Sequence, residues 1–169
     1  MNRQIRIETA GDIAAVFDVN VAAFPTRAEA RLVDVLRESA KEHMSLVALE
    51  NHEIVGHIMF TPVTLESYDE ARLMGLAPMA VSPAAQRAGI GTELVRAGLQ
   101  QCRESGAGAI AVLGHPEFYP RFGFRPASQW RISSEYGVPE EVFMMMELKP
   151  GYLRNYHGVI RYDPASADV

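Results

Sequence analysis

Cysteine is nearly missing from this chain of 169 residues, which has only Cys102. A single cysteine excludes an internal disulfide, so the sequence lacks the marks of a disulfide-stabilised secreted domain. Long apolar runs are missing too, because no stretch of about 18 apolar residues could span a bilayer. The first residues have no apolar signal core. We therefore expect a cytoplasmic protein that is not attached to a membrane.

Acidic residues outnumber basic ones, 21 to 16, and the signature motifs of several enzyme classes are absent. The formal net charge is −5, which argues against a nucleic-acid-binding protein. The five histidines show no HExxH or clustered ligand spacing, so we expect no metal site. The motifs GxGxxG, GxxxxGK[ST] and GxSxG are not found, which disfavours dinucleotide-binding proteins, P-loop enzymes and serine hydrolases.

The patterning that is present indicates a single domain with a mixed α/β fold. Apolar residues make up 48 % of the chain and charged residues 22 %, as in ordinary globular proteins. Apolar spacing predicts helices at 12–24, from Thr26 onward and at 89–103. Strands are predicted at 5–8, 45–50, 54–65, 73–83, 107–114 and 142–149.

The predicted order of elements is β-α-α-β-β-β-α-β-α-β-β, with a central mixed sheet flanked by helices. We expect one domain over residues 1–162 and a flexible tail over 163–169. At the centre of this order is a strand, a glycine-containing loop, a helix and a second strand.

The loop "SPAAQRAGIG" at 82–91 joins that strand to its helix. Gly89 and Gly91 allow the backbone to approach a ligand closely, since neither residue carries a Cβ. The helix N-terminus presents free N–H groups and the positive end of the helix dipole, both of which attract anions. From the residues alone, the loop is either a tight turn or a cradle for a phosphate or pyrophosphate.

The segment "MAVSPAAQRAGIGTELVRAGL" at 79–99 resembles the acyl-CoA signature of the GNAT superfamily of N-acetyltransferases. The pattern Q/R-x-x-G-x-G/A of that superfamily fits Gln86 to Gly91 without a gap. A second family landmark, FYxxxGF, is present at 118–124. The stretches "VLGHPEFYPRFGF", "VPEEVFMMMEL" and "GVIRY" further resemble the bacterial branch related to YhbS. The resemblance covers nearly the whole chain and implies a GNAT-like fold with acetyl-CoA as co-substrate.

The resemblance assigns coenzyme binding to the strand and loop around this motif. Backbone N–H groups of the loop would hold the pyrophosphate, while the strand pairs its main chain with the pantetheine arm and polarises the thioester carbonyl. The side chain of Arg87 either adds charge to a phosphate or lies in solvent. The implied binding residues are Met79, Ala80, Val81, Gln86, Arg87, Ala88, Gly89, Ile90, Gly91 and Thr92.

The resemblance also implies direct attack of an amine on the thioester, with Tyr119 donating a proton to the departing thiolate. The alternative for Tyr119 is a packed aromatic residue with a hydroxyl at the surface. Many family members carry a glutamate on the strand before the loop, but "GLAPMAV" at 75–81 has no carboxylate. His115 is the candidate base because an imidazole suits this task. His57 and Glu117 are further candidates, and a chain of waters without a single base is compatible as well.

Family geometry implies an acceptor site between the first two helices and the last hairpin. Phe24, Arg27, Trp130 and Tyr136 are candidate contacts there, although packing would explain each of them equally well. We expect an acetyl-CoA-dependent N-acetyltransferase acting on a primary amine of a small molecule or peptide, with residues 151–162 as a candidate homodimer surface. Two alternatives stay open: a non-catalytic acyl-CoA sensor or ligand-sequestering protein, and a protein whose loop binds a nucleotide.

Overall fold

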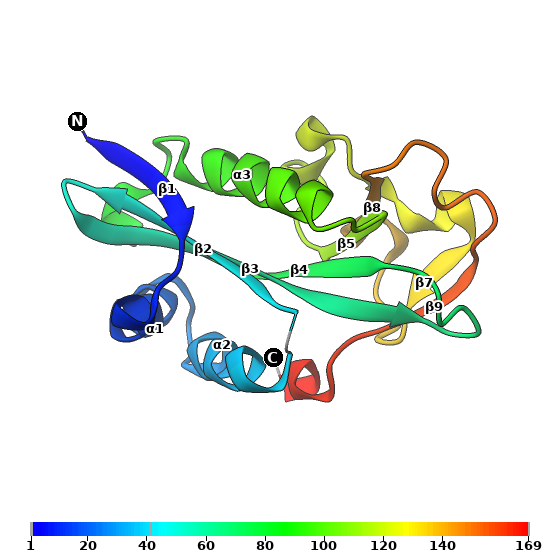
Figure 1. Cartoon of the computed structure of the whole chain (residues 1–169), viewed down its shortest axis with the longest axis horizontal. Coiled ribbons are helices and arrows are strands. Elements are labelled where there is room, and N and C mark those ends of the chain that lie inside the picture. Colours follow the sequence, from blue (N-terminus) through cyan, green and yellow to red (C-terminus); the bar gives the residue numbers. More distant parts are fainter. Residues whose placement is uncertain (1, 41, 169) are drawn as a thin grey trace.

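A computed structural model describes residues 2–40 and 42–168 of the chain. One sheet runs through the molecule, with α3 over one face and α1 and α2 over the other (Figure 1). The helices and strands are β1 Arg3–Ile7, α1 Ile13–Ala23, α2 Ala28–Ser39, β2 Met44–Glu50, β3 Glu53–Leu65, β4 Leu73–Val81, α3 Ile90–Glu104, β5 Ala109–Leu113, β6 Arg125–Pro126, β7 Ile132–Ser134, β8 Phe143–Glu147 and β9 Gly158–Arg161.

The strands pair in the order β1-β2-β3-β4-β5-β8-β6, and β9 pairs with both β3 and β7. Parallel pairs join β4 to β5 and β7 to β9, while the neighbouring strands β1 to β4 are antiparallel. The parallel pair β4–β5 needs a crossover, which α3 provides. The predicted mixed sheet and its central strand–loop–helix–strand unit are therefore confirmed.

The order of elements differs from the prediction after β5. The helix predicted at this point is only a short 3-10 turn, η3 (Tyr119–Phe122), since Pro120 interrupts the segment and Gly123 ends it with a φ of 107°. Where two strands were predicted to follow, the structure has the four short strands β6 to β9. Of these, β8 corresponds to the strand predicted at 142–149, whereas β6, β7 and β9 have only two to four residues, too few for a clear alternating pattern.

The segment expected to be a flexible tail has a defined place in the structure. Pro164–Asp168 forms a 3-10 helix, η6, that lies against α2 (Figure 1). Ala165 packs against the apolar cluster beneath α1 and α2, and the Ser39 hydroxyl donates to the Asp163 carboxylate at 3.3 Å. Val169 lies outside the described residues.

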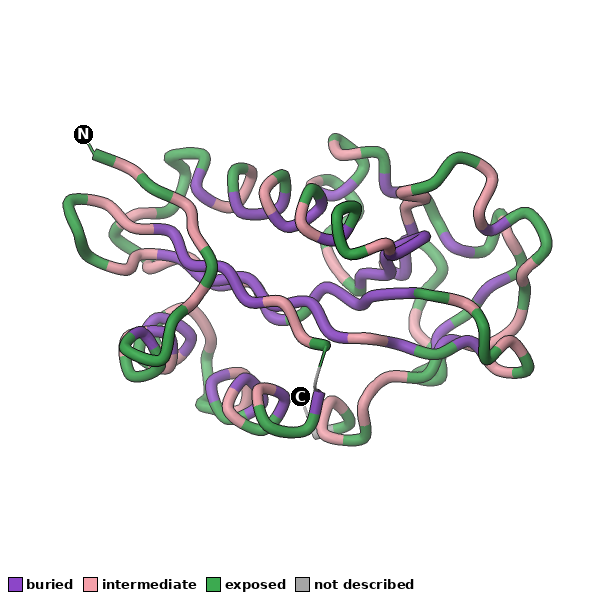
Figure 2. The backbone as a smooth tube through the Cα atoms, viewed as in Figure 1, coloured by how far each residue is buried: buried purple, intermediate pink, exposed green. Residues whose placement is uncertain are grey.

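Side chains of the central strands alternate between two separate cores, as the period of two in a strand requires. On β3, Ile58 and Phe60 pack on the α3 side, whereas His57 and Met59 face α1 and α2. Figure 2 shows the buried backbone gathered in these central strands. Gly98 lets α3 approach closely, because a Cβ there would lie 2.2 Å from the Phe60 ring. This packing holds the N-terminus of α3 beside the end of β4.

Candidate active site

Strand β4 is paired on both edges in its first half and on one edge in its second half. Leu73–Leu76 pair in parallel with β5. Pairing with β3 continues to Val81, after a register shift at which Ala77 and Pro78 lie opposite a single residue of β3. Such a bulge bends the strand that carries it. Among the described strands, none pairs with the outer edge of β4 from Met79 to Val81.

The register of β4 fixes which backbone groups face this open edge. The Ser82 N–H donates to the Val55 carbonyl at 2.8 Å, and bonded pairs alternate along an antiparallel ladder. Ala80 therefore bonds to β3, and its side chain is buried. The backbone polar groups of Met79 and Val81 point outward instead. They are positioned to pair with an extended ligand in the manner of an added strand.

The loop between β4 and α3 presents a run of free backbone donors. Arg87 and Gly89 both adopt a positive φ, of 65° and 85°. No described residue accepts a hydrogen bond from the N–H groups of 87–92. Consecutive free N–H groups at the start of a long helix form a site for an anion. The Gln86 side-chain amide donates to the Val81 carbonyl at 3.1 Å, which ties the loop to the end of β4.

Arg3 of β1 fastens this loop from a distant part of the chain. Its guanidinium donates to the Ala88 carbonyl at 3.1 Å and forms ion pairs with Glu50, at 2.9 Å, and with Glu93. Glu93 lies in the first turn of α3, where an unpaired carboxylate would repel an anionic ligand. Arg3 therefore both holds the loop and neutralises the carboxylate nearest to it.

A cavity of about 1020 Å³ extends from the loop to the open edge of β4. It contains most of the residues predicted to form the site, namely Phe24, Met79, Val81, Gln86, Arg87, Gly89, Ile90, Gly91, Thr92, His115, Glu117 and Tyr119. Four further residues that were not predicted as site residues also line the cavity: Ala23, Pro116, Phe118 and Arg121. Of these, Phe118 and Arg121 stand inside the FYxxxGF landmark and could have been found there.

Three predicted acceptor contacts lie away from this cavity. Arg27 precedes α2 and is not part of the lining. Trp130 lines a separate cavity of about 470 Å³, and Tyr136 stacks on Tyr162 with ring centroids 5.3 Å apart. The segment that carries both aromatic residues adjoins β7 and β9, at the opposite end of the sheet from the β4–α3 loop (Figure 1). Phe24 alone of the predicted acceptor contacts lies at the cavity.

Tyr119 lies in the cavity wall with its ring held by other aromatic residues. It packs edge-to-face on Phe118 and Phe124, with ring centroids 5.0 and 5.6 Å apart. Gly114 leaves room for it, because a Cβ there would lie 2.3 Å from the tyrosine ring. Burial raises the pKa of the Tyr119 phenol to about 12. The hydroxyl has no hydrogen-bond partner among the described residues and stays protonated near neutral pH.

The candidate bases occupy two different environments. His115 and Glu117 are exposed and line the cavity close to Tyr119 in sequence. The His115 carbonyl accepts a hydrogen bond from the Phe118 N–H at 3.1 Å, which shapes the turn between β5 and η3. Both side chains are therefore accessible to a ligand in the cavity.

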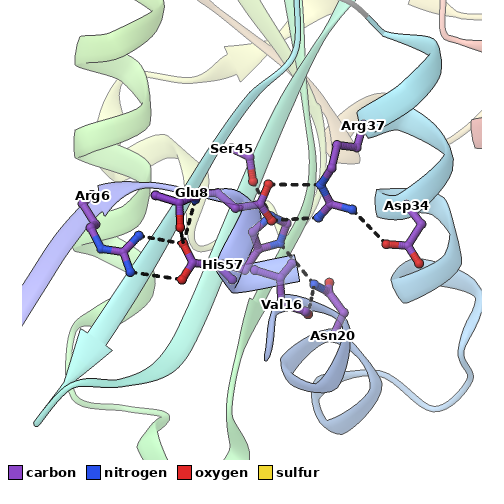
Figure 3. Close-up of polar contacts among 10 residues, drawn as sticks. Arg6, Glu8, Val16, Asn20, Asp34, Arg37, Ser45 and His57 are labelled. Atoms are coloured by element: carbon purple, nitrogen blue, oxygen red, sulfur yellow. Dashed lines mark hydrogen bonds and ion pairs between the residues drawn. The ribbon is translucent and has the colours of Figure 1, made fainter. Parts of the chain in front are cut away.

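His57 instead lies buried on the opposite face of the sheet, beneath α1 (Figure 3). The Asn20 amide nitrogen donates to the Val16 carbonyl and contacts His57 Nδ1 at 3.1 Å, while Nε2 lies 2.8 Å from the Ser45 hydroxyl. Nδ1 thus accepts and Nε2 carries the proton. Burial, together with the charge of Arg37, lowers the pKa of His57 to about 3. A neutral imidazole away from the cavity is not placed to take a proton from a substrate there.

The described residues give little support for catalysis by a cysteine nucleophile or by a bound metal ion. Cys102 is buried in α3, and burial raises the pKa of its thiol to about 12, which disfavours a nucleophilic thiolate. Within residues 2–40 and 42–168, no three His, Cys, Asp or Glu side chains gather as a metal site would require. None of the described helices is long and apolar enough to cross a membrane.

Comparison with known proteins agrees with this geometry. The acetyltransferase (GNAT) family model matches residues 13–124, which include the loop and Tyr119. The chain belongs to the GNAT family. It is 40 % identical over 134 residues to the uncharacterized N-acetyltransferase YjhQ of Escherichia coli K12, covering 77 % of this chain and 74 % of that protein. It is 31 % identical over 159 residues to the uncharacterized N-acetyltransferase YhbS of the same strain, covering 94 % and 95 %.

Two solved GNAT structures share the fold over almost the entire chain. The crystal structure of E. coli YhbS in complex with CoA gives a TM-score of 0.93 at 28 % identity and covers 98 % of this chain and 92 % of that one. A GNAT family acetyltransferase from Brucella melitensis in complex with acetyl-CoA gives 0.80 at 33 % identity, covering 98 % of both chains. The resemblance to the YhbS-related branch is thereby confirmed.

Proposed function

We propose that this protein is an N-acetyltransferase that moves an acetyl group from acetyl-CoA to a primary amine of a small molecule or peptide. The observation that carries the proposal is that one cavity joins the free N–H groups of 87–92, the open edge of β4 and Tyr119. Acetyl-CoA has a matching sequence of groups: a pyrophosphate, an amide-containing arm and a thioester. The complexes of the YhbS and Brucella proteins with CoA and acetyl-CoA support this assignment.

The proposed reaction is direct attack of the amine on the thioester. A bond forms between the amine nitrogen and the carbonyl carbon, the C–S bond breaks, and its electron pair leaves on sulfur. An outward N–H of Met79 or Val81 donates to the carbonyl oxygen as negative charge develops on it. The amine nitrogen loses one proton in the process, and the sulfur needs a donor.

Tyr119 supplies the donor at the sulfur. Its pKa of about 12 lies well above the value of roughly 8.5 for an ordinary thiol, so complete proton transfer to the thiolate is uphill. The phenol therefore stabilises the departing thiolate chiefly by a hydrogen bond, which is strong because the acceptor is charged. This refines the expected role of Tyr119 from proton donor to hydrogen-bond donor.

His115 and Glu117 line the cavity and are the candidates to accept the proton of the amine, because the second half of β4 carries no carboxylate. We assign this role to His115, whose exposed position allows transfer through water. Replacement of His115 by glutamine should then shift the pH profile of kcat, whereas Glu117→Gln should not. The reverse result would assign the role to Glu117.

A calorimetric titration with acetyl-CoA, with ATP and NAD as controls, tests the proposal, followed by a panel of amines for turnover. Selective binding of acetyl-CoA and acetylation of an amine are expected. Selective binding without turnover on any amine would favour an acyl-CoA sensor. Equal binding of ATP or NAD would contradict the assignment of the loop to acyl-CoA.

A further inference from the structure

A smaller cavity, of about 230 Å³, adjoins the proposed coenzyme site along the outer surface of α3. The cavity combines basic and apolar side chains and is lined by Arg96, Leu99, Arg103, Arg121, Phe122 and Met146. Arg121 also lines the larger cavity, so the two spaces meet at this side chain. Three arginines in one small cavity are a concentration of positive charge in a chain whose formal net charge is −5.

These guanidinium groups are not neutralised within the described part of the chain, where no carboxylate forms an ion pair with Arg96, Arg103 or Arg121. Arg96 lies 5.9 Å from the ring centroid of Phe122 and Arg121 lies 4.6 Å from that of Phe118. Arginines that stack on aromatic rings keep their N–H edges free for planar, bidentate recognition of phosphate.

Arg121 is also fixed by its own chain. Its Nε donates to the Phe118 carbonyl at 3.0 Å, which leaves its two terminal nitrogens without partners among the described residues. The side chain is thus held at the boundary between the two cavities. A guanidinium held in this way loses little conformational freedom when an anion binds.

Helix geometry relates Arg96 to the pyrophosphate loop. Thr92 lines the larger cavity, and Arg96 is on the same face of α3 because residues four apart are neighbours on a helix. At about 1.5 Å of rise per residue, Arg96 lies about 6 Å beyond Thr92, and Arg103 about 17 Å beyond it. Arg96 does not itself line the larger cavity, and its guanidinium lies over Phe122 in the smaller one. Arg103 is too far along α3 to share a ligand with the loop.

Coenzyme A carries a third phosphate, on the 3′ position of its ribose, and the ribose and the pantetheine arm leave opposite ends of the pyrophosphate. With the pyrophosphate at 87–92 and the arm along β4, the nucleotide end leaves the loop toward α3 and η3. We propose that Arg96 and Arg121 bind this 3′-phosphate and make the site selective for CoA over 3′-dephospho-CoA. The inference rests on the proposed function, since it requires CoA to occupy the larger cavity.

Calorimetric titration of the whole protein with CoA and with 3′-dephospho-CoA tests this inference. The wild type should bind CoA about tenfold more tightly or better, as expected for charge-assisted hydrogen bonds to one phosphate. In Arg96→Gln and Arg121→Gln, the affinity for CoA should fall several-fold while the affinity for dephospho-CoA stays within about twofold. The matched control Arg103→Gln removes an arginine from the same face of α3 and should leave the preference intact.

The ratio of the two affinities separates loss of the phosphate contact from a change in structure. A variant that merely disturbs the turn at Phe118 would bind both ligands more weakly and keep the wild-type ratio, which would contradict the inference. Equal binding of CoA and dephospho-CoA by the wild type would also overturn it, yet would leave the proposed function standing. If the wild type binds neither ligand, the proposed function itself fails.

Discussion

Two polar regions flank the same central strands, and they differ in whether their hydrogen-bonding groups have partners within the protein. Beneath α1, the two ring nitrogens of His57 each have a partner, in Asn20 and Ser45 (Figure 3). At the end of β4, the N–H groups of 87–92 and the outward N–H groups of Met79 and Val81 lack partners among the described residues, beside a cavity of about 1020 Å³.

Buried polar groups are almost always hydrogen-bonded, because an unpaired one costs free energy. The paired region around His57 therefore serves the stability of the sheet and of α1. The unpaired groups along the loop border the cavity, where a ligand could reach them. Changes in the paired region should alter folding, while changes in the unpaired region should alter binding and turnover.

The largest expected effect is the loss of stability in acid. The folded protein holds His57 neutral down to a pKa of about 3, whereas the unfolded chain takes up this proton near pH 6.5. Because the unfolded state binds more protons between these values, the free energy of unfolding should fall as pH drops below 6.5, by up to about 1.4 kcal/mol per pH unit. Chemical denaturation between pH 7 and 4.5 measures this slope.

His57→Gln is the matched variant for that slope, since glutamine does not titrate. It should be less stable than the wild type at pH 7 but should lose less stability on acidification, while its affinity for acetyl-CoA stays unchanged. A variant that follows the wild-type slope would show that other groups cause the acid sensitivity.

The next largest effect concerns Tyr119 in the unpaired region. Tyr119→Phe keeps the packed ring but removes the hydroxyl, so kcat should fall about hundredfold with little change in the dissociation constant for acetyl-CoA. Steady-state kinetics and calorimetry measure the two quantities. Tyr136→Phe, far from the cavity, is the control and should be neutral. If kcat and the affinity for acetyl-CoA fall together in Tyr119→Phe, the proposed role of the Tyr119 hydroxyl at the thiolate is wrong.

Two glycines, one at each end of α3, allow the effect of backbone strain to be separated from the effect on ligand binding. Gly89 has a φ of 85° and Gly106 a φ of 90°, and a Cβ at either would meet no atom within 4 Å. Valine at either position should cost about 1–2 kcal/mol of stability through backbone strain alone. Only Gly89→Val should also weaken acetyl-CoA binding, by about tenfold, because it distorts the run of N–H groups.

Thermal unfolding and calorimetry of both glycine variants separate strain from binding. If Gly106→Val weakens acetyl-CoA binding as much as Gly89→Val does, the conformation of the loop is not what holds the ligand.

The smallest expected effect comes from the contact between β1 and the loop. Arg3→Gln removes the hydrogen bond to the Ala88 carbonyl and frees the carboxylate of Glu93, so the KM for acetyl-CoA should rise about threefold to tenfold with kcat nearly unchanged. The control Arg161→Gln breaks an exposed ion pair with Glu66 and should leave KM alone. An unchanged KM in Arg3→Gln would show that the loop holds its shape without β1.

Prediction from sequence reached furthest for the features of the candidate site that depend on contiguous backbone. The loop at 82–91 and the turn with Tyr119 are local features, because glycine positions and a helix start determine which N–H groups are free. The cavity lining contains most of the residues that these two motifs contributed. Features that depend on residues close together in the chain can be predicted from a single sequence.

The remaining features depend on contacts between distant segments. Arg3 reaches a loop 85 residues away, and no periodicity in β1 signals that contact. The bulge in β4 at Ala77 and Pro78 arises from register against β3, and the short strands β6, β7 and β9 exist only through their pairing. Trp130 and Tyr136 were expected at the acceptor site because the path of the last strands could not be derived from their pattern.

Amide hydrogen exchange with and without acetyl-CoA tests the central claim most directly. The account predicts new protection at Met79, Val81 and 87–92, while the amides of β3 around His57, already bonded in the sheet, change little. Binding of acetyl-CoA without protection of the loop amides would contradict the claim that this unpaired backbone holds the ligand.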